Sequence, residues 1–193
     1  MSHIIATTED DRFRVRLVRD EAPANPREHG SGRVHVLTID THLGRYLPVD
    51  ADGGPLAAAW DRLKWDRWKG VETFIRYVSI MHGGIVLESA PQSGPRSLWY
   101  MTGDEILALD AGLLTEGYVE AEMEEYEAWA EGDVWGYVIE EYADWTRDGR
   151  PDESMTTWGE VDSGFDLYGG PWARACAREA LAHHVARSAC RAA

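Results

Sequence analysis

Hydrophobic and polar residues alternate strictly along RFRVRLVR, residues 12–19. A period of two residues predicts a β-strand that buries one face, here through Phe13, Val15 and Leu17. Other apolar or β-branched runs predict further strands at residues 33–40, 84–89, 97–102 and 134–142. The last of these is expected to pair with TTWGEV at 156–161 as a hairpin, across a loop with a turn at Asp148–Gly149.

Helical spacing of apolar residues alternates with these strands. It predicts a helix over 55–69 with Leu56, Trp60 and Leu63 on one face and Gly70 after its end. A second helix is expected to end near Gly83, with an apolar face formed by Phe74, Val78 and Met81. Trp65 and Trp68 lie off the main apolar face of the first helix, among basic residues, and are interpreted as a second packing surface or a site for stacking on bases or a nucleotide.

The segment TGDE, 102–105, has the spacing of a capping box and predicts the start of a short helix. A longer helix is expected from Thr115 to Glu131, and a C-terminal helix over 172–189. The inward side of the C-terminal helix is expected to carry Trp172, Cys176, Leu181, His184 and Val185. Between the hairpin and this helix, DSGFDLYGGP at 162–171 is interpreted as a Gly-rich loop. The pattern as a whole predicts an α+β fold, a single domain over residues 1–193 with helices packed on an antiparallel sheet.

Composition narrows the class of protein. The chain has 193 residues, of which 44% are hydrophobic and 27% charged, so we expect a folded globular protein. No apolar run reaches the ~18 residues that a membrane span needs. If Cys176 and Cys190 lie on one helix, they are about 21 Å apart, too far for a disulfide. These features predict a reduced, cytoplasmic protein that does not bind membranes.

The net charge of −15 is concentrated in one third of the chain. Residues 104–166 contain 20 acids against only Arg147 and Arg150, a net charge of −18. Such a field repels nucleic acid and favours basic partners. The carboxylates expected to form a partner-binding surface are Glu116, Glu120, Glu124, Glu127, Glu131, Glu140 and Glu141.

Five of these glutamates follow helical spacing along residues 115–131, with no lysine to relieve their repulsion. Carboxylates four residues apart recur every ~6 Å along a helix, a spacing in the range of phosphates along a strand. Three interpretations remain open: a solvated face that keeps the protein soluble, a surface for a basic partner that includes mimicry of nucleic acid, and calcium binding. Because Trp135, Tyr137 and Tyr126 accompany the acids, we expect the charges to lie on folded structure.

Complete catalytic and metal-binding motifs are absent from the sequence. Cys176 and His183 lie seven residues apart, but one thiolate and one imidazole do not complete a zinc site, and no C-x-x-C or H-x-x-x-H accompanies them. We therefore expect no metal, no cofactor and no assigned catalytic residue. An alternative, enzymatic or ligand-binding interpretation places a pocket near 162–170, with its polar groups supplied by Asp162, Ser163 and Tyr168.

Several segments taken together resemble a family of small uncharacterised proteins carried by phages and other mobile elements. The similar segments are VRDEAPANPREHGSGRVHVLTIDTHLGRY at 18–46, GIVLESAPQSGPRSLWYMTGDEI, EGDVWGYVIEE and VDSGFDLYGGPWARACAREA. The resemblance departs at Gly164, where the family loop usually has a cysteine, and at 165–167, which interrupt the family's Trp-Gly-Phe run. Such small accessory proteins often act by binding host machinery.

The sequence and this resemblance together favour a non-enzymatic accessory protein. It would bind a basic host protein through its acidic surface, and would not contact nucleic acid directly. Besides the enzymatic alternative, a self-associating structural or regulatory module, such as a homodimer, remains open. Sedimentation at varied concentration distinguishes that module from the binding protein.

Overall fold

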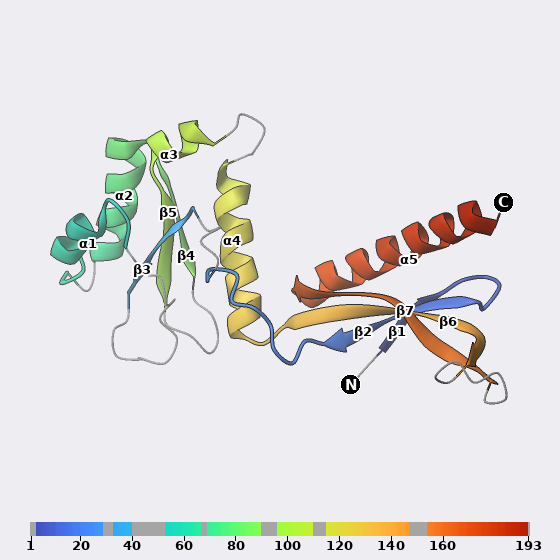
Figure 1. The fold of residues 1–193 in the computed structure, drawn as a ribbon. Coiled ribbons are helices and arrows are strands. Elements are labelled where there is room, and N and C mark those ends of the chain that lie inside the picture. Colours follow the sequence, from blue (N-terminus) through green and yellow to red (C-terminus); the bar gives the residue numbers. More distant parts are fainter. Residues whose placement is uncertain are drawn as a thin grey trace. The chain divides into compact units, whose positions relative to one another are not determined.

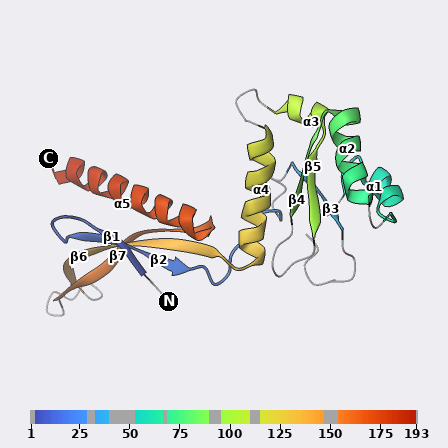
Figure 2. The ribbon, with the colours of Figure 1, turned by 180° about the vertical axis from the view of Figure 1, so that it is seen from behind.

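The fold described here is that of a computed structural model, which describes residues 3–28, 33–39, 53–66, 69–89, 96–109, 115–146 and 154–192. It contains five helices and two antiparallel sheets within these ranges, so the predicted α+β class with antiparallel pairing is confirmed. The fold is drawn in Figure 1 and from behind in Figure 2. The expected turn at Asp148–Gly149 lies outside the described residues, and so does Trp68.

The chain divides into two compact units, which are described separately below. The terminal unit comprises residues 1–24 and 132–193, and the central unit comprises residues 25–131. Each unit holds one of the two sheets, whereas the sequence predicts one sheet. The single domain over residues 1–193 stays a prediction.

The sheet of the terminal unit has four strands in the order β1-β2-β6-β7, all antiparallel. The strands are β1 (His3–Thr7), β2 (Phe13–Arg19), β6 (Val134–Thr146) and β7 (Ser154–Tyr168). Along β2 the residues alternate between buried and half-buried, as the period of two residues predicts. The sequence did not predict β1, because its apolar stretch of four residues is too short to show a period.

One face of this sheet is covered by helix α5 (Gly170–Ala192). The core between them contains Phe13, Val15, Leu17 and Ile139 from the sheet and Ala173, Ala177 and Leu181 from the helix. Small alanines on the inner side of α5 let the helix backbone lie close to the sheet. Trp172, in the first turn of α5, is 64% exposed, so the prediction that it points inward is wrong.

Strand β7 corrects the prediction of a Gly-rich loop at 162–171, because pairing with β6 continues through Tyr168. Gly164 in this segment and Gly136 on β6 make room for an aromatic ring of the neighbouring strand. A Cβ atom on Gly164 would lie 2.7 Å from Tyr137 Cε1, and one on Gly136 would lie 2.4 Å from Phe165 Cδ1. A glycine inside a strand can therefore mark a close contact with an aromatic ring of the neighbouring strand, and does not by itself indicate a turn.

The central unit has a three-stranded antiparallel sheet in the order β3-β5-β4. Its strands are β3 (His35–Thr38), β4 (Ile85–Ser89) and β5 (Ser97–Met101). Every residue of the middle strand β5 is buried, because helices lie against both faces of the sheet. Figure 1 shows α1 and α2 on one side of this sheet and α4 on the other.

The helices of the central unit are α1 (Ala57–Leu63), α2 (Gly70–His82), α3 (Gly103–Ala108) and α4 (Thr115–Ala130). Trp60, Phe74 and Val78 pack with Tyr100 on one side of the sheet. The helix over 55–69 is shorter than expected, and Trp65 beyond its end is exposed. Met81 is also exposed, although it shares the helical face of Phe74, because it lies in the last turn of α2.

Two local predictions are confirmed in this unit. Gly83 adopts the left-handed conformation, with φ of 57°, and ends α2. The capping box at the start of α3 is complete: the Thr102 hydroxyl accepts a hydrogen bond from the Glu105 amide, and the Glu105 carboxylate accepts one from the Thr102 amide.

Candidate functional site

Helix α4 carries the predicted acidic surface and is fixed to the central sheet by its apolar side. Val119 and Tyr126 are buried, and they pack in a cluster with Trp99, Met101 and other residues. The Tyr126 ring lies 5.5 Å from that of Trp99. Side chains on the opposite side of α4 are therefore presented on a rigid scaffold, as the sequence predicts from the accompanying aromatic residues.

Glu120, Glu124 and Glu131 are exposed and form a row along α4 and the residue after it. Their spacing of four and seven residues places them about 6 Å and 10.5 Å apart along the helix axis. Residues 115–131 contain no lysine or arginine. Among the residues that the structure describes, none forms an ion pair with these three carboxylates. Glu116 belongs to the helix, but its side chain lies outside the described part.

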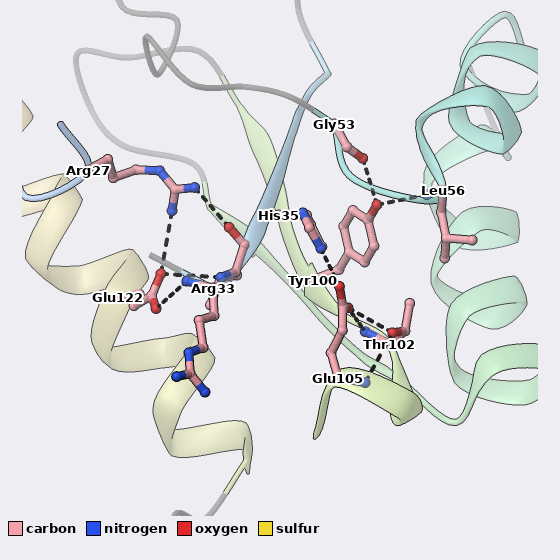
Figure 3. Close-up of polar contacts among 10 residues, drawn as sticks. Arg27, Arg33, His35, Gly53, Leu56, Tyr100, Thr102, Glu105 and Glu122 are labelled. Carbon is pink, nitrogen blue, oxygen red and sulfur yellow. Dashed lines mark hydrogen bonds and ion pairs between the residues drawn. The ribbon is translucent and has the colours of Figure 1, made fainter. Parts of the chain in front are cut away.

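Glu122 and Glu127 belong to the same helix but are bound within the unit. Glu122 accepts hydrogen bonds from the backbone amides of Arg33 at 3.0 Å and Val34 at 3.4 Å, and its Oε2 lies 3.5 Å from Arg27 Nη1 (Figure 3). Arg27 in turn donates to the Val34 carbonyl at 2.9 Å. Glu127 accepts a hydrogen bond from the Ser89 hydroxyl. Glu127 is thus half-buried at the edge of the acidic row.

The titration of two side chains on α4 reflects this environment. Burial, and then the hydrogen bond and charge of Glu122, raise the pKa of Tyr118 to about 12. Burial, and then the charge of Glu122, raise the pKa of Glu125 above its ordinary value of 4.5. The Tyr118 hydroxyl therefore stays protonated at neutral pH, and the negative charge of this helix resides in its glutamates.

The two acidic residues predicted on the strand, Glu140 and Glu141, lie in the terminal unit. Glu140 is only 8% exposed. Its carboxylate lies between Arg14 Nε at 2.7 Å and Arg16 Nε at 3.1 Å. Glu141 pairs with Arg12 Nη2 at 2.7 Å. Arg14 and Arg16 of β2 and Arg12, directly before it, neutralise both carboxylates, which are therefore not available as part of a free acidic surface.

The groups predicted to line a pocket near 162–170 lie on β7 and do not converge. Asp162 is opposite Ile139, on the face covered by α5, and its Oδ2 lies 3.1 Å from Arg187 Nη2. Ser163 is exposed on the other face of the strand. Tyr168 donates a hydrogen bond to the Ala24 carbonyl at 2.8 Å. Each group thus has a separate environment.

Asp162 has neighbours that sequence reasoning missed. His184 Nδ1 lies 3.6 Å from Asp162 Oδ2 and has no hydrogen-bond partner among the residues that the structure describes. Burial, and then the charges of Asp162 and Cys176, raise the pKa of the nearby Tyr137 hydroxyl. Burial also raises the pKa of the Cys176 thiol. The ion pair of Asp162 with Arg187 joins β7 to α5 in this region.

A second polar cluster, around His35 of β3, was also missed because its members lie far apart in the sequence (Figure 3). His35 Nε2 lies 2.6 Å from Glu105 Oε1, and its ring centroid lies 5.2 Å from that of Tyr100. The Tyr100 hydroxyl donates to the Gly53 carbonyl and accepts from the Leu56 amide. These contacts fix the segment before α1, together with α3, onto the sheet.

Burial alone would raise the pKa of Glu105, but hydrogen bonds from His35 and Thr102 lower it below its ordinary value of 4.5. Both carboxylate oxygens of Glu105 are engaged, Oε1 by His35 and Oε2 by Thr102. The cluster is therefore a structural link within the central unit, in which the capping box also orients a histidine.

Among the described residues, no group of three or more histidine, cysteine, aspartate or glutamate side chains is placed to hold a metal ion. Cys176 and Cys190 are free. The helices of the described part are too short or too polar to cross a bilayer.

No protein-family model, curated protein or solved structure matches the chain. The resemblance to proteins of phages and mobile elements therefore stays a prediction from the motifs.

Proposed function

We propose that the protein is a non-enzymatic binding protein that presents the exposed carboxylates of α4 to a basic protein partner. The observation that carries this proposal is the row of Glu120, Glu124 and Glu131 on a helix anchored by Val119 and Tyr126. Anchoring matters because carboxylates held in place lose less conformational freedom when they bind than carboxylates on a mobile segment.

The unrelieved charge supports the same proposal. Like charges four residues apart each destabilise a helix by about 0.2–0.5 kcal/mol. Glu122 and Glu127 have partners inside the unit. The exposed row of Glu120, Glu124 and Glu131 has no ion pair among the described residues. A basic partner would relieve this repulsion on binding. The spacing of the row fits a protein that binds phosphates, so mimicry of nucleic acid belongs to the proposal.

The sequence motifs and the free cysteines support a proposal for the kind of partner and for the compartment. The resemblance to proteins of phages and mobile elements favours an accessory protein whose partner is a basic host protein. The free cysteines support a reducing compartment, and we place the protein in the cytoplasm.

Charge reversal on α4 tests the proposal. A variant with Glu120→Lys, Glu124→Lys and Glu131→Lys is compared with a matched control, Glu9→Lys, Glu21→Lys and Glu179→Lys, which changes the net charge equally at exposed sites of the terminal unit. Basic proteins captured from a bacterial extract are identified and their dissociation constants are measured with each variant.

We expect the α4 variant to weaken binding at least about tenfold, and the control much less, because only α4 would contact the partner. Binding of the wild-type protein should also weaken steeply as salt is raised from about 0.05 M to about 0.5 M. Equal losses in the two variants would indicate nonspecific attraction to an acidic protein. Unchanged binding in the α4 variant would refute the proposal.

A further inference from the structure

The sheet of the terminal unit has a second face, opposite the one that α5 covers. Side chains on alternate positions of a strand point to opposite faces, so Arg14, Arg16 and Val18, which alternate with Phe13, Val15 and Leu17, lie on this second face. We call it the open face. It carries Ile4, Thr7, Arg14, Arg16, Val18, Gly136, Val138, Glu140, Tyr142, Asp144, Thr156, Trp158, Glu160, Ser163 and Phe165.

Large apolar side chains are exposed on the open face. Ile4 is 58%, Tyr142 49% and Phe165 52% exposed. Tyr142 packs against Trp158 with ring centroids 5.4 Å apart, and the Arg14 guanidinium lies 4.1 Å from the centre of the Trp158 ring. A sheet face in contact with water normally carries short polar side chains or lysine. This face instead has the aromatic residues and arginines that are enriched at the centres of protein interfaces, and it has no lysine.

The charges of the open face nearly balance. Arg14 and Arg16 stand against Glu140, Asp144 and Glu160, a net charge of −1, and both signs lie in neighbouring strands. The chain as a whole carries −15, so two copies repel each other over most surfaces. The open face is a surface on which two acidic copies can meet with little of that repulsion. A two-fold interface also requires a patch that is complementary to itself, and a face that carries both signs of charge can meet this requirement.

The area of the open face is sufficient for such contact. Four strands at their usual spacing, together with the longer β6–β7 ribbon, give a footprint of about 650 Å². Specific protein interfaces bury about 600–1,000 Å² on each partner, so this footprint lies at the lower end of their range. We therefore propose that the open face binds a second copy of this chain, forming a homodimer in which Ile4, Tyr142 and Phe165 supply exposed apolar contacts. This interface is separate from the acidic row of α4.

Sedimentation equilibrium of the full chain tests this proposal from about 1 µM to about 500 µM, which brackets a dissociation constant in the micromolar range expected for a small interface. We expect the wild-type protein to pass from monomer to dimer. Tyr142→Glu should raise the dissociation constant at least about tenfold, because it replaces an exposed aromatic contact of the interface with an unpaired charge. Trp172→Glu is the matched control, since Trp172 is an exposed aromatic residue on α5.

Ile4→Glu provides a second variant at the edge of the sheet, should Tyr142→Glu fail to fold by circular dichroism. The indole NH signals in an NMR spectrum locate the interface: that of Trp158 should shift with concentration, whereas that of Trp172 should not. A wild-type protein that stays monomeric at every concentration overturns the proposal. A dimer that is weakened by Trp172→Glu, and not by Tyr142→Glu or Ile4→Glu, overturns it as well. Neither result would bear on partner binding by α4, because charge reversal there tests a different surface.

Discussion

Helix α4 and strand β6 both carry a dense run of carboxylates, but they differ in what lies beside them. On β6, Glu140 is enclosed by Arg14 and Arg16 of β2, and Glu141 pairs with Arg12. On α4, Glu120 and Glu124 are exposed and have no ion pair among the described residues. The strand uses its carboxylates to join two strands, whereas the helix leaves a row of them at the surface.

The difference shows that the density of acids along a chain does not reveal which charges are displayed. The cations that neutralise Glu140 lie more than 120 residues away in the sequence, and only strand pairing brings them together. A helix offers its neighbours at three and four residues as partners, and on α4 these are glutamates or apolar residues.

Removing the carboxylate of Glu140 should have the largest effect on stability. Glu140→Ala leaves the guanidiniums of Arg14 and Arg16 half-buried without their partner, so we expect the free energy of unfolding to fall by about 3 kcal/mol. Urea denaturation measures this change. Glu160→Ala is the control, because Glu160 lies opposite Glu140 on β7 but is exposed, and it should change stability by less than about 0.5 kcal/mol. Equal effects would contradict the contrast.

A comparison within α4 should give the next largest effect. Glu122→Ala removes the acceptor for the amides of Arg33 and Val34 and the partner of Arg27, so a loss of about 2 kcal/mol is expected. Glu124→Ala, two residues away on the exposed side, should leave the free energy of unfolding within about 0.5 kcal/mol. Calorimetry of both variants under the same conditions measures this difference. If Glu124→Ala lowers the free energy of unfolding as much as Glu122→Ala, the Glu124 carboxylate has a stabilising partner within the protein.

The dependence of stability on pH should have opposite signs at Glu105 and Glu125. The pKa of Glu105 is lowered, so its contribution is present above the ordinary value of 4.5 and is lost as pH falls below it. The pKa of Glu125 is raised, so this carboxylate destabilises the fold above 4.5, and protonation relieves the cost as pH falls.

Denaturation between about pH 3 and pH 7 measures both effects. Glu105→Gln should lower stability at neutral pH and flatten the acid loss, whereas Glu125→Gln should raise stability at neutral pH and have no effect at about pH 3. If both variants raise stability at neutral pH, or both lower it, the opposite pKa shifts assigned to Glu105 and Glu125 are wrong.

The smallest effect is expected from neutralising the exposed row. Glu120→Gln removes a like-charge pair with Glu124, so stability should rise by about 0.2–0.5 kcal/mol at low salt. The gain should disappear near 1 M salt, where charges are screened within about 3 Å. A thermal melting curve at each salt concentration measures it. A loss of stability at low salt would indicate an ion pair that involves Glu120.

Sequence reasoning succeeded where the physical signal is local. Alternation along 13–19 predicted β2, Gly83 predicted the end of α2, and the spacing of Thr102 and Glu105 predicted the capping box. Each depends on residues within a few positions of one another. The helical spacing of glutamates predicted the exposed row on α4 in the same way, although it did not distinguish the row from Glu127, which binds Ser89.

It failed where distant residues decide the structure. Gly164 and Gly169 indicated a loop, but Gly164 lies in β7 because the ring of Tyr137 on the neighbouring strand occupies the space of a side chain. Glu140 was assigned to a free surface because its arginine partners lie on β2. The links from His35 to Glu105 and from Asp162 to Arg187 have no sequence spacing that would reveal them.

The most direct test of the contrast between α4 and β6 is an NMR titration of the protein with a lysine-rich peptide at low salt. The peptide is a probe for a basic partner. The free row on α4 predicts that amide signals of residues 117–131 shift on binding, that those around Glu140 and Glu141 do not, and that about 0.5 M salt reverses the shifts. Shifts centred on β6, or spread evenly over both units, would contradict the account.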